Sequence, residues 1–110
     1  MDKMIVTGGE RLVGEIEVSG AKNAALPLMA ASILADEPCV IHGVPHLRDI
    51  VTFKKLLGQL GVQCEGNGDL RIDPSGLNSS EAPYDLVKTM RASTLVLGPL
   101  LAKKGAARVS

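Results

Sequence analysis

The sequence predicts an α/β fold, because stretches with the period of a strand and stretches with the period of a helix follow one another along the chain. Glycine-rich turns separate neighbouring strand-like stretches, and short loops with proline or polar residues separate strands from helices. The expected order is strand, strand, helix, strand, helix, strand, strand, helix, strand. This order contains repeated strand–helix–strand units.

The first two strands are expected at residues 3–7 and 12–19, as a hairpin around Gly8 and Gly9. Residues 12–19 alternate between two faces, which is the period of a strand with one solvated side. One face carries Leu12, Gly14, Ile16 and Val18, and the other carries Val13, Glu15 and Glu17.

The first helix is expected from about Ala24 to Leu34. Pro27 is tolerable there only near the first turn, because a proline farther in would remove a backbone donor and clash with the preceding turn. Alanine and leucine make nearly every face of this helix apolar, which predicts burial on several sides.

A short β-branched run at residues 39–42 predicts a strand, and a second helix should follow from about Arg48 to Leu60, ended by Gly61. Two further strands, 62–65 and 70–73, bracket a strong turn signal at 66–69, where Asn and Gly accept positive φ. The buried stripe of the second helix should consist of Ile50, Phe53, Leu57 and Leu60.

The third helix is expected from Tyr84 or Asp85 to Leu101, and a last strand from Ala107 to Ser110. The sequence stops inside this apparent strand, without a stop signal or a polar tail. We therefore expect it to be the front end of a longer protein.

Composition narrows the function classes. The 110 residues hold 12 basic and 12 acidic side chains, one Phe, one Tyr and no Trp, so neither a basic surface nor aromatic stacking for nucleic acid is expected. No apolar run has the length of a signal peptide or a membrane span, so we expect a cytoplasmic protein that does not insert into membranes.

The cysteines and histidines give no metal signal. Cys39 and Cys64 form no CxxC motif, and in a cytosolic protein they fit small buried apolar residues better than a disulfide or a metal site. His42 and His46 are four residues apart but flank a Gly-Val-Pro turn, so they do not share a helix face as zinc ligands would. We expect neither a metal nor a cofactor.

Lys22 and Asn23 lie where a strand-like run meets the first helix. Unpaired backbone N–H groups point outward at a helix start, and a lysine there adds a full charge to an anion site. The alternative is a solvated surface lysine beside an ordinary capping asparagine.

Arg91 lies in the predicted third helix, one turn after Lys88 and near polar residues. Its planar guanidinium suits diphosphate oxygens. The alternative is a surface arginine paired with Asp85 or Glu81. Lys88 and Tyr84 are weaker candidates.

Two motifs add a resemblance: SGAKNAALP at residues 19–27 and APYDLVKTMRAS at residues 82–93. They resemble the N-terminal part of the enolpyruvyl transferases, in the branch that acts on UDP-N-acetylglucosamine. The branch that acts on shikimate 3-phosphate has a serine-rich stretch around its lysine instead of AKNAA. The segments between the motifs also fit the family register, so the resemblance covers essentially the whole chain.

The resemblance implies part of an inside-out α/β barrel built of βαβαββ repeats. Residues 1–20 would form an opening β-hairpin that associates with the other domain of a full-length enzyme, and residues 21–110 an incomplete first α/β domain. The implied activity is transfer of the enolpyruvyl group from phosphoenolpyruvate to the 3′-hydroxyl of UDP-N-acetylglucosamine, with release of phosphate. That is the first committed step of peptidoglycan synthesis, and it serves cell-wall formation, cell shape and cell division.

The resemblance also assigns residues. Lys22 and Asn23 would bind phosphoenolpyruvate, and Arg91 would bind UDP-N-acetylglucosamine. The catalytic cysteine or aspartate of the family lies on a loop beyond Ser110, and neither Cys39 nor Cys64 matches it, so this segment alone should be inactive. Two alternatives stay open: a 3-phosphoshikimate 1-carboxyvinyltransferase-like enzyme, and a noncatalytic ligand-binding relative.

Overall fold

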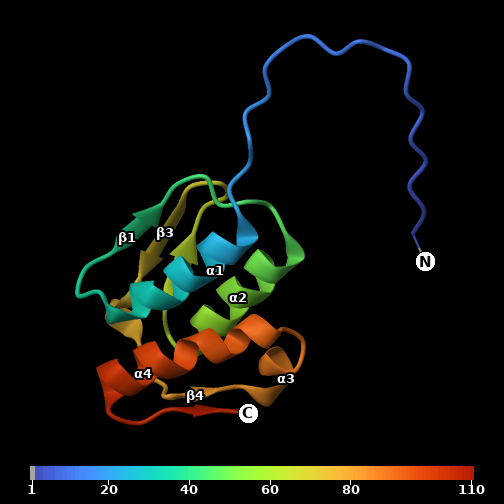
Figure 1. The fold of residues 1–110 in the computed structure, drawn as a ribbon. Coiled ribbons are helices and arrows are strands. Elements are labelled where there is room, and N and C mark those ends of the chain that lie inside the picture. The colour runs from blue at the N-terminus through green and yellow to red at the C-terminus, as the bar shows by residue number, and fades with distance from the viewer. Residues whose placement is uncertain (1) are drawn as a thin grey trace.

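A computed structural model describes residues 2–110 of the chain. Residues 21–110 form a folded body, and residues 2–20 leave it as an extended arm (Figure 1). The elements are, in chain order, α1 (Lys22–Ala31), the 3₁₀ turn η1 (Ser32–Leu34), β1 (Cys39–Ile41), α2 (Arg48–Gln59), β2 (Gln63–Glu65), β3 (Leu70–Asp73), the 3₁₀ turn η2 (Pro74–Gly76), β4 (Glu81–Ala82), α3 (Tyr84–Val87), the 3₁₀ segment η3 (Arg91–Val96), α4 (Leu97–Lys104) and β5 (Arg108–Val109).

The main sheet has three strands in the order β1-β3-β2. Both outer strands run antiparallel to β3, so β1 and β2 are parallel to each other and α2 connects them. The predicted strand–helix–strand unit is therefore present, with β3 inserted between its two strands. A second such unit is formed by β4 and β5, which pair in parallel after the chain has passed through α3, η3 and α4.

The predicted hairpin at residues 62–73 is confirmed, with Gln63 opposite Asp73. The glycines supply the unusual backbone of the turn, with φ of 104° at Gly66 and 78° at Gly68. Asn67 does not adopt positive φ, so that part of the turn prediction is wrong.

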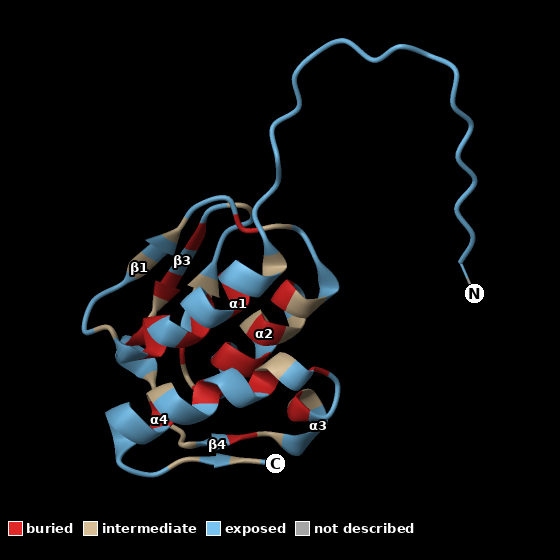
Figure 2. Ribbon diagram, viewed as in Figure 1, coloured by how far each residue is buried: buried red, intermediate tan, exposed pale blue. Residues whose placement is uncertain are grey.

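The core lies between the sheet and the helices (Figure 2). Leu70 and Ile72 of β3 are buried while Arg71 between them is exposed, as expected for a sheet with one covered face. The predicted stripe of α2 is confirmed, because all four of its residues are buried. The stripe also includes Leu56.

The first helix begins at Lys22, earlier than predicted. Pro27 therefore lies beyond the first turn, which the sequence analysis did not expect. Because a proline has no N–H, the carbonyl of Asn23 receives no hydrogen bond from the residue four positions ahead. The helix also keeps one open side, since Leu28 is 52% exposed and the 3₁₀ residue Leu34 is 49% exposed.

The prediction of one continuous helix from residue 84 to residue 101 is wrong. The chain forms α3, an extended break at Met90 (φ −151°, ψ 119°), and then η3 and α4. The break buries Met90 in the core, where this residue is 6% exposed. Pro99 bears on a later point of the chain, because α4 begins at Leu97 and so places Pro99 in its first turn.

The opening hairpin is not formed in this structure. Residues 2–20 contain no strand, and apolar side chains such as Leu12 and Ile16 are more than nine-tenths exposed. An isolated two-stranded hairpin is marginal in water, and nothing in the body covers its apolar face (Figure 2). The first residue of this predicted segment, Met1, lies outside the described residues.

Candidate functional site

Lys22 and Asn23 are the first two residues of α1. The residue before them, Ala21, is extended (φ −83°, ψ 130°), and no side chain caps the helix. Asn23 is therefore not the capping residue that the sequence analysis considered. The first N–H groups of the helix are left without a side-chain partner, which favours a negatively charged ligand nearby.

A surface hollow of about 340 Å³ lies at this helix start. It brings together α1, the first turn of α2 and the chain from Thr89 to Ala92. Lys22, Asn23 and Arg91 all line it, so the three residues that the sequence analysis singled out share one hollow. The other lining residues are Leu26, Asp49, Thr89, Met90 and Ala92.

Lys22 is held by a carboxylate. Its Nζ donates a hydrogen bond of 2.9 Å to Oδ2 of Asp49, and the two side chains are 41% and 36% exposed. Asp49 is not among the site residues predicted from the sequence. The partnership spans 27 positions along the chain, so no local pattern could have indicated it.

Arg91 is the first residue of η3 and is exposed. The surface pairing considered for it does not occur, because Asp85 pairs with Lys88 at 3.1 Å and Glu81 lies 3.9 Å from Arg108. Among residues 2–110, no carboxylate forms an ion pair with Arg91. Its guanidinium is available to a ligand.

The weaker candidates contact each other instead of the hollow. Lys88 Nζ lies 5.4 Å from the centre of the Tyr84 ring, a cation–π distance. Neither residue lines the hollow of Lys22.

Lys22 and Arg91 are each the first residue of a helical segment. Each follows an extended residue, Ala21 or Met90, and the segments lead to β1 and β5. The hollow thus receives the first residues of two such segments. A cation at each start reinforces the partial positive charge of the free N–H groups.

The remaining polar candidates lie elsewhere. His42 Nδ1 is 3.1 Å from Asp69, and this bond, with one from the Gly43 N–H, lowers the pKa of the Asp69 carboxyl.

Both cysteines are free and half-buried, and both lie opposite Ile72. Burial raises the pKa of the Cys64 thiol to about 11, which makes it a poor nucleophile. No cluster of three metal-ligating side chains occurs within the described part of the chain.

Comparison with known proteins identifies the family. The model of the family EPSP synthase (3-phosphoshikimate 1-carboxyvinyltransferase) matches residues 6–110. The chain belongs to this family. The predicted relationship to enolpyruvyl transferases is thereby confirmed.

Curated relatives refine this result. The chain is 58% identical over 110 residues to UDP-N-acetylglucosamine 1-carboxyvinyltransferase of Pectobacterium carotovorum subsp. carotovorum and 56% identical over 111 residues to that of Acinetobacter baylyi. All of this chain is covered, but only 26% and 27% of those relatives. The chain therefore spans about a quarter of the length of these members of the family.

A solved structure confirms the fold class. The enolpyruvyl transferase NikO from Streptomyces tendae superposes with a TM-score of 0.81 at 27% identity, over 94% of this chain and 24% of that chain. The α/β prediction is confirmed, while the inside-out barrel stays a prediction. Within residues 2–110, no helix combines the length and the apolar character that crossing a membrane requires.

Proposed function

We propose that this chain forms the first part of the substrate cleft of a UDP-N-acetylglucosamine 1-carboxyvinyltransferase. The observation that carries the proposal is the convergence of Lys22, Asn23 and Arg91 on one hollow. The identity of 56–58% to relatives of that name supports this branch of the family over the shikimate branch.

In the proposed reaction the 3′-hydroxyl group of the sugar loses its proton to a base and its oxygen bonds to C2 of phosphoenolpyruvate, while C3 gains a proton from an acid. The tetrahedral intermediate then loses phosphate from C2 and a proton from C3, which leaves the enolpyruvyl ether. Carboxylate, phosphate and diphosphate groups gather in one cleft during these steps. Cations placed before reaction are therefore the natural source of stabilisation.

Four residues of the hollow have a role in this proposal. Lys22 acts as a point charge on the anionic groups of phosphoenolpyruvate, and Asn23 orients them by donating from its amide. Arg91 binds diphosphate oxygens of the UDP-sugar through its planar fork. Asp49 holds the Lys22 ammonium group in place from across the hollow.

The proposal also concerns the rest of the enzyme. Proton transfer requires a group on the loop expected beyond Ser110, and the extended segment 2–20 would pair with the other domain. The exposed apolar side chains of that segment support such pairing, since they need a covering surface. The proposed reaction would place the enzyme in the cytoplasm and in peptidoglycan synthesis.

Phosphate release by the full-length protein tests the proposal. Phosphoenolpyruvate is supplied with either UDP-N-acetylglucosamine or shikimate 3-phosphate as acceptor. We expect phosphate only with the UDP-sugar. Release with shikimate 3-phosphate would assign the chain to the other branch, and release with neither acceptor would favour a noncatalytic relative.

A further inference from the structure

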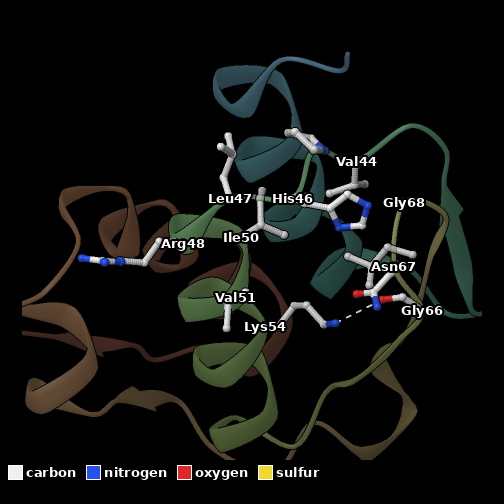
Figure 3. Close-up of a pocket in the computed structure, with 12 residues that line it drawn as sticks. Val44, His46, Leu47, Arg48, Ile50, Val51, Lys54, Gly66, Asn67 and Gly68 are labelled. Atoms are coloured by element: carbon white, nitrogen blue, oxygen red, sulfur yellow. Dashed lines mark hydrogen bonds between the residues drawn. The ribbon is translucent and has the colours of Figure 1, made fainter. Parts of the chain in front are cut away.

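A second hollow lies on the other side of the first turn of α2 (Figure 3). It encloses about 310 Å³ between the loop 44–47, α2 and the turn of the β2–β3 hairpin. This volume is at the lower end of the range for small-molecule sites. It shares no lining residue with the hollow of Lys22 and has no part in the proposed transfer reaction.

Two hydrogen bonds fix the walls of this α2–hairpin hollow. The Val44 N–H donates to the Gly68 carbonyl at 2.7 Å, and Lys54 Nζ donates to the Gly66 carbonyl at 3.1 Å. The first bond joins the loop to the hairpin, and the second joins the helix to it. The hollow is therefore formed before any ligand arrives, which reduces the ordering that binding requires.

The chemistry of the hollow is that of an amphipathic anion site. Val44, Ile50 and Leu70 supply buried apolar surface. Figure 3 shows Lys54 and Asn67 at the hairpin end with the His46 ring turned toward them, whereas Arg48 points away. Lys54 uses one ammonium proton on Gly66, and the ammonium group of a lysine has three donors.

Among residues 2–110, no carboxylate lines the α2–hairpin hollow. The acidic residues next to its lining segments are engaged or directed elsewhere: Asp49 bonds Lys22, and Asp69 bonds His42. Glu65 lines a neighbouring hollow that Lys54 also borders, but no ion pair joins the two side chains among residues 2–110. The Lys54 ammonium group therefore has no carboxylate partner in the described part of the chain, and the complementary ligand is negatively charged.

We propose that the α2–hairpin hollow binds a small anion that carries a compact apolar group, such as an aryl or branched-chain carboxylate. Its apolar part packs against Val44, Ile50 and Leu70, and its carboxylate accepts hydrogen bonds from Lys54 and Asn67. This is a site additional to the cleft of Lys22, Asn23 and Arg91.

Calorimetric titration of the full-length protein with benzoate tests the site, with benzyl alcohol as the neutral probe of similar size. We expect benzoate to bind with a dissociation constant of about 1 mM, a usual value for so small a ligand, and benzyl alcohol to bind at least about ten-fold more weakly. No heat from benzoate, or equal affinity for the two probes, overturns the proposal.

Variants locate the binding. Lys54→Met should weaken benzoate binding about ten-fold, because it removes the charge at the site. Lys55→Met is the matched control, since Lys55 is the exposed next residue of α2 and lies outside the hollow. Val51→Trp should also abolish binding by filling the hollow while it keeps Lys54, and thermal melts check that each variant is folded. Loss of binding in Lys22→Ala, with retention in Lys54→Met, would place benzoate in the other cleft and overturn the proposal.

Discussion

Lys22 and Arg91 are the first residues of two helical segments beside one hollow, but they are held differently. Asp49 binds the Lys22 ammonium group at 2.9 Å, whereas Arg91 is exposed and pairs with no carboxylate among residues 2–110. A lysine in a fixed place can stabilise charge that develops during reaction, because its position does not have to be found at that moment. A free arginine can instead adjust to a flexible diphosphate, and its ordering accompanies binding.

The isolated 110-residue chain tests whether the two cations suffice without the rest of the enzyme. We expect no transferase activity, because the proposed reaction needs a proton donor and a second domain that closes the cleft against water, and neither is expected within these residues. Low stability is also expected, since the arm and the outer faces of α1 and α4 expose apolar side chains. Phosphate release and a thermal melt measure the two expectations separately. Turnover by a preparation verified to contain only the 110-residue chain would contradict the proposal that the proton donor lies on the rest of the enzyme.

Lys22→Ala in the full-length enzyme should lower turnover by about 10²–10³-fold, the usual loss when a preorganised electrostatic contact is removed. The fold should persist, because the side chain is partly exposed and lies outside the core. Phosphate release and a melting curve check this, with Lys55→Ala on the exposed side of α2 as the control. Near-normal turnover would return Lys22 to the role of a surface lysine.

Asp49→Asn removes the charge that holds Lys22. The Lys22 ammonium group would then lack a carboxylate partner, as the Arg91 guanidinium does. An ion pair at this exposure contributes at most about 1 kcal/mol, so we expect roughly a five-fold loss in kcat/KM. Asp49→Glu should recover part of it. Asp85→Asn, which alters an exposed pair outside the hollow, is the control. An unchanged KM for phosphoenolpyruvate together with an unchanged kcat would show that Asp49 does not position Lys22 for the reaction.

Arg91→Lys keeps the charge but loses the planar fork, so it should weaken UDP-sugar binding by about ten-fold and phosphoenolpyruvate binding less. Calorimetric titration with each ligand compares the two effects. Arg108→Lys provides the matched control, because Arg108 is also exposed but lies on β5 away from the hollow. Equal losses of affinity for the two ligands would mean that Arg91 does not bind the UDP-sugar in preference to phosphoenolpyruvate.

The local features of this fold could be read from the sequence. The spacing of Ile50, Phe53, Leu57 and Leu60 predicts the buried face of α2, because a helix repeats every 3.6 residues whatever surrounds it. The hairpin between β2 and β3 is equally local, since two glycines allow the turn. The position of Lys22 and Asn23 at a helix start indicated an anion site, and the resemblance of the AKNAA and KTMRAS motifs to a family assigned ligands to these residues and to Arg91.

Tertiary structure decided the features that depend on distant partners. The break before Arg91 places Met90 in the core while Pro99 moves into the first turn of α4, so packing prevailed over the helical pattern of residues 84–101. The arm alternates like a strand but pairs with nothing here, because a strand needs a neighbour to satisfy its backbone groups. The Asp49–Lys22 bond and the meeting of Lys22 with Arg91 join residues far apart in the chain. Local periodicity carries no information about such contacts, and only the packing of α1 against α2 and η3 brings these side chains into one hollow.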